Sequence, residues 1–143
     1  MRYMLDTNIC IYLLQGQPTA VFERFAQLEF GDVVMSCLTL AELRRGASSR
    51  SARERQQDMD NLDALIEDIP ALPFDSVAAG AFAELGGRSK LRRNHAIDNL
   101  LAAHAISVGA ILVTNNEKDF RGYAGVQVEN WAAPERPSPA GKK

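Results

Sequence analysis

The chain has 143 residues, of which 46% are hydrophobic and 24% charged, and this composition is typical of one globular domain with a single core. No apolar run approaches the roughly 18 to 20 residues of a membrane span, and the N-terminus lacks the pattern of a signal peptide. The formal net charge of −2 hides strong local segregation of charge, so it excludes neither a nucleic-acid nor a protein partner.

Short apolar runs alternate with longer stretches of helical period, which predicts an α/β domain. Strands are expected at 2–6, 32–36, 69–72, 110–114 and 126–129. Helices are expected from 7 or 8 to 14, from 18 onward, at 39–47, at 51–68, from 75 or 76 onward, and at 98–108. Phe22 and Val77 are expected on the packed faces of the second and fifth helices. The proline-rich residues 132–143 are expected to form a disordered tail after a domain at 1–131.

The two cysteines, Cys10 and Cys37, lie in apolar stretches and have no metal-binding spacing. We interpret both as buried free thiols, which suits a reducing cytoplasm.

Buried strands joined by helices indicate a mostly parallel central sheet flanked by helices on both faces. In such sheets the ligand site lies beyond the carboxyl ends of the strands. Four acids fall at or near that edge: Asp6 closes the first strand, Glu42 lies in the helix after the second, Asp98 opens the helix at 98–108, and Asp119 follows the strand at 110–114.

Each of these acids also has a purely structural explanation. Asp6 could cap the next helix, and Asp98 could be an N-cap or a first-turn acid that complements the helix dipole. Glu42 could form a capping box with Thr39, and Asp119 could be a solvated loop acid. Four converging carboxylates would nevertheless raise one another's pKa, and a divalent cation removes that repulsion. Hard oxygen ligands suit Mg²⁺ or Mn²⁺, so the pattern favours metal-dependent hydrolysis of a phosphodiester.

Other chemistries find less support in the residues. A glycine-rich phosphate loop and a GxSxG elbow are absent from the sequence. A phosphatase or receiver-type domain with Asp6 as its nucleophile needs a second acid nearby, whereas Asn8 stands two residues on. His104 lies about 240° around the helix from Asp98, so we expect a packed or hydrogen-bonded histidine there. A non-catalytic module that binds RNA or a partner peptide remains the alternative.

Four segments together resemble the VapC-type ribonuclease toxins of the PIN-domain family: MLDTN at 4–8, TLAEL at 39–43, DNLLAAHA at 98–105, and LVTNN at 112–116 followed by DF. The resemblance spans about residues 1–131. It implies a single PIN-like domain, an endoribonuclease that depends on Mg²⁺ or Mn²⁺, and the toxin role in a type II toxin–antitoxin pair. It also implies a homodimer held inactive by a VapB-like antitoxin, whose C-terminal segment occupies the cleft.

The resemblance carries the family's catalytic acids onto Asp6, Glu42, Asp98 and Asp119, with Asp6 and Asp98 as direct metal ligands. The supporting residues that it implies are Thr7, Thr114 and Asn116. Because many relatives have an acid where this chain has Asn116, either the second metal site is weak or Asp119 serves in its place.

Two basic clusters, at 44–55 and 88–93, adjoin Glu42 and Asp98 in the sequence. We expect them to flank the acidic cleft and to contact RNA phosphates, chiefly through Arg44, Arg45, Arg92 and Arg93. Two alternative roles for these clusters remain open: they could form a solvated helix face, or they could bind an acidic tail of the antitoxin. Many relatives cut tRNA anticodon loops, so a tRNA is the expected substrate. The apolar segments at 18–30 and 58–68 are expected to pack across a dimer interface.

Overall fold

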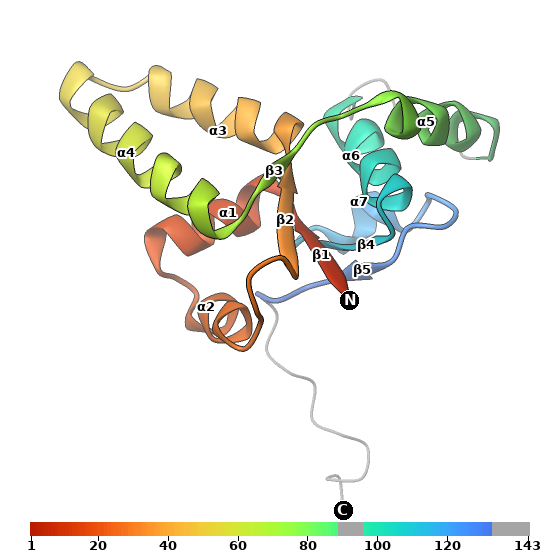
Figure 1. Ribbon diagram of the computed structural model, residues 1–143, viewed down its shortest axis with the longest axis horizontal. Helices are drawn as coiled ribbons and strands as arrows, with labels where there is room; N and C mark the ends of the chain where they lie inside the picture. The colour runs from red at the N-terminus through yellow and green to blue at the C-terminus, as the bar shows by residue number, and fades with distance from the viewer. Residues whose placement is uncertain (89–95, 133–143) are drawn as a thin grey trace, which may run out of the picture.

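A five-stranded sheet forms the centre of the computed structural model, which describes residues 1–88 and 96–132 (Figure 1). All strand pairs are parallel and the order is β3-β2-β1-β4-β5. The strands are β1 Arg2–Leu5, β2 Val33–Ser36, β3 Ala71–Leu72, β4 Ala110–Val113 and β5 Val128–Glu129. The prediction of an α/β domain with a parallel sheet is confirmed, and the carboxyl ends of the strands share one edge.

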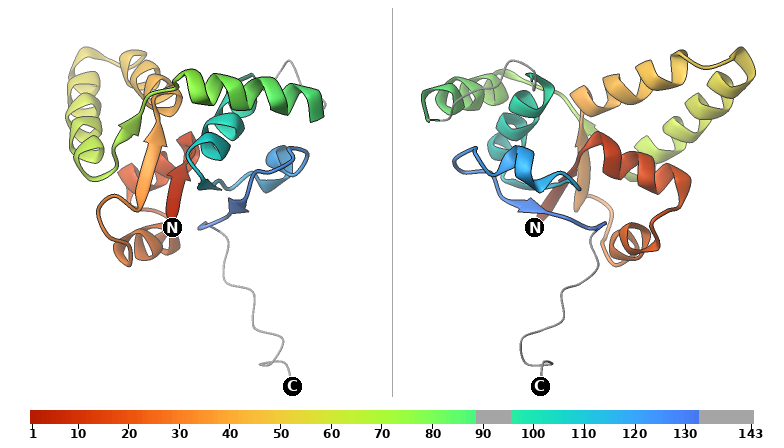
Figure 2. Two further views of the ribbon diagram at one scale, coloured as in Figure 1. Left: turned by 45° about the vertical axis from the view of Figure 1, so that its right-hand side comes forward. Right: turned by 180° about the vertical axis from the view of Figure 1, so that it is seen from behind.

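The helices lie on both sides of the sheet. On one side are α1 Thr7–Gln15, α2 Thr19–Ala26, α3 Cys37–Ser48 and α4 Ala52–Asp68 (Figures 1 and 2). On the other side are α5 Ser76–Arg88, α6 Ala96–Ser107 and the one-turn helix α7 Glu117–Phe120. None of the helices in the described ranges is long and apolar enough to cross a membrane.

Two hydrophobic cores fill the spaces between the sheet and the helices. Successive side chains of a strand point to opposite faces, so β1 places Tyr3 and Leu5 in the core beneath α1–α4 and Met4 in the core beneath α5–α7. The central strand β1 is paired on both sides, with Leu5 opposite Met35 of β2 and Val113 of β4. The end of β1 is therefore a rigid point in the fold.

Two strands lead directly into helices through capping residues. Asp6 is the N-cap of α1 and accepts a hydrogen bond from the Ile9 N–H at 3.0 Å, so the cap is neither Thr7 nor Asn8. Ser36 caps α3 by accepting the Leu38 N–H at 3.0 Å. The alternative explanation of Glu42 as part of a capping box at Thr39 is excluded, because α3 has already begun at Cys37.

Two elements near the sheet edge differ from their predicted bounds. The helix α6 begins at Ala96, so Asp98 lies within its first turn and is not its cap. The helix α7 was not predicted, because its segment follows two asparagines and has the composition of a loop.

Three side chains predicted to be buried are exposed. Phe22 and Val77 retain 52% and 64% of their exposure, because the neighbouring Val21 and Ala78 take the inward positions on α2 and α5. Cys37 is also exposed, since it opens α3 at the sheet edge, whereas Cys10 is buried as expected.

The apolar surface of α2 generates a prediction about assembly. Phe22 and Phe30, which is 75% exposed, leave an uncovered patch, whereas α4 turns Leu62 into the core. We expect a second copy of the chain to cover this patch, so light scattering at micromolar concentration should give twice the 15.7 kDa chain mass. The double variant Phe22→Ser/Phe30→Ser should be monomeric, and Val77→Ser is the matched control. A monomeric wild-type protein would contradict this expectation.

Candidate active site

Asp6 is a buried carboxylate at the carboxyl end of the central strand, with 8% of its surface exposed. One carboxylate oxygen accepts the Ile9 N–H, and the Thr114 side chain also hydrogen-bonds to it. The Thr114 oxygen accepts the Asn116 N–H at 3.0 Å, so its hydroxyl proton is free to point at Asp6. Asp6 is therefore oriented by two donors before any ligand arrives.

The surroundings of Asp6 disfavour its negative charge. Burial raises the pKa of Asp6 most, and the charges of Asp98 and Glu42 raise it further, while the hydrogen bonds from Thr114 and Ile9 lower it. The net pKa lies above its ordinary value. Asp98 and Glu42 thus both lie close enough to Asp6 to oppose its charge.

Glu42 projects from α3 at the exposed edge of the sheet and meets α1. The Thr7 hydroxyl donates to Glu42 Oε1 at 2.7 Å, a link between two helices that start from neighbouring strands. Glu42 is thus held by Thr7 and not by the predicted partner Thr39.

Asp98 and Asp119 are both half-buried, but only Asp98 is close to the centre of the site. Asp98 lies in the first turn of α6 and is one of the two acids that act on Asp6. Asp119 lies in α7, where its Oδ2 accepts the Asn116 amide N–H at 2.5 Å. Among the described groups, Asp119 is not one of the charges that shift Asp6. The structure therefore pairs Asp119 with Asn116, whose backbone N–H is hydrogen-bonded to Thr114.

The chemistry of these side chains suits a hard cation. Within residues 1–88 and 96–132, Asp6, Glu42 and Asp119 form no ion pair with a lysine or arginine. Carboxylate and hydroxyl oxygens are the donors that Mg²⁺ and Mn²⁺ prefer. In the same ranges no three acidic, histidine or cysteine side chains yet lie close enough together to hold an ion. The donor types fit the cation, and the side chains would have to close around it.

A chain of polar side chains at the same edge was missed by sequence reasoning. The Asn8 amide donates to Asn115 Oδ1 at 3.5 Å, and the Asn115 amide donates to the Tyr12 hydroxyl at 2.7 Å. Both positions adjoin the acidic edge in the sequence, because Asn8 lies two residues after Asp6 and Asn115 follows the predicted strand at 110–114. Periodicity alone assigns such residues to turns.

Two of the five arginines in the first basic cluster form ion pairs with acids of α4. Arg44 forms an ion pair with Asp63 at 3.5 Å, and Arg50 pairs with Glu54 and with Asp58. Arg45 is exposed. The other two predicted RNA-binding residues, Arg92 and Arg93, lie outside the described residues, as does the tail from residue 133 onward.

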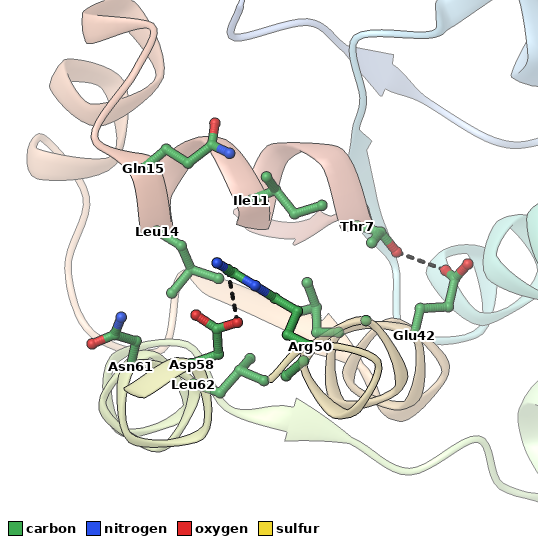
Figure 3. Close-up of a pocket in the computed structure, with 12 residues that line it drawn as sticks. Thr7, Ile11, Leu14, Gln15, Glu42, Arg50, Asp58, Asn61 and Leu62 are labelled. Atoms are coloured by element: carbon green, nitrogen blue, oxygen red, sulfur yellow. Dashed lines mark hydrogen bonds and ion pairs between the residues drawn. The ribbon is translucent and has the colours of Figure 1, made fainter. Parts of the chain in front are cut away.

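A groove of about 300 Å³ lies between α1, α3 and α4 and reaches the acidic edge (Figure 3). Its apolar lining includes Ile11, Leu14 and Leu62, which Figure 3 shows on the facing helices. Thr7 and Glu42 lie at one end of the groove, and the Arg50–Asp58 ion pair lies across the gap between α3 and α4. An apolar segment of a partner can therefore lie next to Glu42.

Comparisons with known proteins agree with this fold. The PIN domain family model matches residues 3–126. The tRNA(fMet)-specific endonuclease VapC of Shigella flexneri is 35% identical, covering 92% of this chain and 99% of that protein. Ribonuclease VapC2 of Rickettsia felis is 33% identical and covers 92% and 98%, respectively.

A solved structure gives the same result. A chain in the structure of VapBC2 from Rickettsia felis bound to a DNA fragment from its promoter superposes with a TM-score of 0.79 at 30% identity. That match covers 92% of this chain and 99% of the other. The chain therefore belongs to the PIN domain family and, within it, to the VapC group.

Proposed function

We propose that this protein is an endoribonuclease that requires Mg²⁺ or Mn²⁺ and acts as the toxin of a type II toxin–antitoxin pair. The observation that carries the proposal is the buried Asp6 beside Asp98 and Glu42 at the carboxyl edge of a PIN fold. The names of the relatives, a tRNA(fMet)-specific endonuclease and a ribonuclease, support RNA as the substrate class.

The proposed site divides the work among its side chains. Asp6 and Asp98 would hold the cation, with Asp6 kept in orientation by Thr114 and the Ile9 N–H. A bound divalent cation supplies an activated water and stabilises the leaving oxygen. Glu42 is fixed through Oε1 by Thr7, so its second oxygen is available to orient that water or accept its proton. Asp119, paired with Asn116, would act at the side of the site.

A module that only binds RNA or a peptide is the main alternative. Such a module has no use for a buried carboxylate whose charge is opposed by two further acids, because that arrangement costs stability. A catalytic site that binds a cation explains why the protein keeps these acids together despite the loss of stability.

The chain's basic residues would bring a tRNA to the acidic edge. Because Arg44 and Arg50 form ion pairs, we propose Arg45, together with Arg92 and Arg93, as phosphate contacts. Charge reversal at Arg92 and Arg93 should weaken tRNA binding and flatten its salt dependence in a filter-binding assay. Reversal at Arg2, at the amino end of β1, is the control. Unchanged binding by the Arg92/Arg93 variant at low and moderate salt would remove this cluster from the RNA surface.

A VapB-like antitoxin is the proposed partner, since the similar solved structures include VapBC complexes. An apolar segment of the antitoxin would occupy the groove between α1, α3 and α4 and so block access to Glu42. The cytoplasm, where tRNA is available, is the proposed location.

Asp6→Asn tests catalysis and separates it from folding. Asparagine can still accept the Ile9 N–H, so the cap of α1 is kept while the charge is lost. We expect cleavage of tRNA in Mg²⁺ to fall to the level seen with excess chelator, whereas Asp60→Asn, at an exposed site on α4, should remain active. Cleavage by the wild type in excess chelator would contradict the proposal.

The same variant should change the pH dependence of stability in a defined direction. The native pKa of Asp6 lies above its ordinary value of 3.8, so the unfolded state releases this proton first as the pH rises. Wild type therefore loses free energy of unfolding relative to Asp6→Asn as the pH rises from about 3.8 through the native pKa. Urea unfolding of the metal-free proteins measures this difference across the pH range. A difference that stays constant, or that changes in favour of the wild type as the pH rises, would contradict the assigned burial effect.

The toxin role makes a prediction in cells. Induced expression of the wild type alone should arrest growth, and Asp6→Asn at equal protein levels should not. Co-expression of the antitoxin encoded beside it should restore growth to the wild-type strain. Equal growth with wild type and variant would count against a toxin.

A further inference from the structure

His104 is a buried side chain that the proposed reaction does not use. It lies on α6, has no exposed surface, and packs edge-on against Phe74 with ring centroids 5.5 Å apart. Its Nδ1 lies 2.8 Å from the Ser36 hydroxyl oxygen. A buried hydrogen bond thus joins α6 to the end of β2 and the start of α3.

Ser36 makes a second hydrogen bond, which leaves its hydroxyl proton available for His104. Its oxygen already accepts the Leu38 N–H as the cap of α3, and a hydroxyl has only one proton to donate. We therefore assign Ser36 as the donor and Nδ1 as the acceptor, which leaves His104 neutral with its proton on Nε2. The pKa of His104 lies below its ordinary value, which favours the neutral form. Burial lowers this pKa more than Asp75 and the Pro73 carbonyl raise it.

The hydrogen bond between Ser36 and His104 lies the same number of residues from Glu42 as from Asp98. Glu42 lies six residues after Ser36 along α3, and Asp98 lies six residues before His104 along α6. At 1.5 Å per residue each acid is roughly 9 Å along its helix from the hydrogen bond. Both intervening segments are continuous helix, so a shift at the hydrogen bond moves each acid with its helix.

We propose that His104 is a positioning residue, which fixes the separation of Glu42 from Asp98 by tying α6 to the capped start of α3. The inference rests on the proposed function and extends it to a residue outside the acidic site. Catalytic groups need to be placed within about 0.5 Å, and changes in residues that support metal ligands commonly weaken metal binding about 10- to 100-fold. Thr7 fixes Glu42 against α1, so His104 supplies the complementary tie to α6.

The test compares two substitutions at one position. His104→Leu keeps an apolar side chain of similar bulk but removes the acceptor, whereas His104→Asn places a carbonyl oxygen near the position of Nδ1. We expect the dissociation constant for Mn²⁺, measured by electron paramagnetic resonance without RNA, to rise about tenfold in His104→Leu and to stay within about threefold of wild type in His104→Asn. The rate of RNA cleavage should follow the same order.

Two controls separate positioning from general loss of stability. Val21→Ala removes buried atoms from α2 in the other core and should lower the urea midpoint without changing Mn²⁺ affinity. Ser36→Ala should weaken Mn²⁺ binding, and the double variant Ser36→Ala/His104→Leu should bind no more weakly than the weaker single variant. If His104→Leu does not fold, Ser36→Ala and His104→Asn carry the comparison.

Wild-type Mn²⁺ affinity in His104→Leu, or in Ser36→Ala if the leucine variant is unfolded, would overturn the positioning role. Additive losses in the double variant would also overturn it. A wild-type protein that binds no Mn²⁺ would instead contradict the proposed function, so the two failures are distinguishable.

Discussion

The burial of one carboxylate at the end of the central strand determines how the rest of the site is built. Asp6 follows β1, which is paired on both sides, so its backbone cannot shift without disturbing β2 and β4. Its side chain caps α1 and accepts the Thr114 hydrogen bond, while burial and two nearby acids oppose its charge. Asp6 thus has a fixed orientation and a raised pKa, a combination that is common at functional sites.

The remaining acids reach Asp6 through helices that start at the same sheet edge. Glu42 is held by Thr7 of α1, and α6, which carries Asp98, is tied to Ser36 through His104. These contacts join α1, α3 and α6 on opposite sides of the sheet, and each is a hydrogen bond between side chains distant in sequence. The adjoining groove reaches Glu42, so a partner bound there can act on the same residues.

The sheet, the parallel direction of its strands and the edge that carries the acids could be predicted, because buried strands alternating with helices leave few topologies. The start of α3 could not, because TLAE fits a capping box as well as it fits a helix interior. The hydrogen bond from the Leu38 N–H to Ser36 shows which of the two is formed. The helix α7 was hidden by the turn-forming Asn115 and Asn116. The pairing of His104 with Ser36 spans 68 residues, and no local pattern encodes such a contact.

The most direct test of this account is the titration of the Asp6 carboxyl carbon by NMR, with and without Mg²⁺. We predict a pKa above 3.8 in the metal-free protein, because burial and the neighbouring acids disfavour the charge. We predict that Mg²⁺ lowers this pKa, because a cation bound to the carboxylate favours its ionised form. An Asp6 pKa at or below its ordinary value, unchanged by millimolar Mg²⁺, would contradict the account.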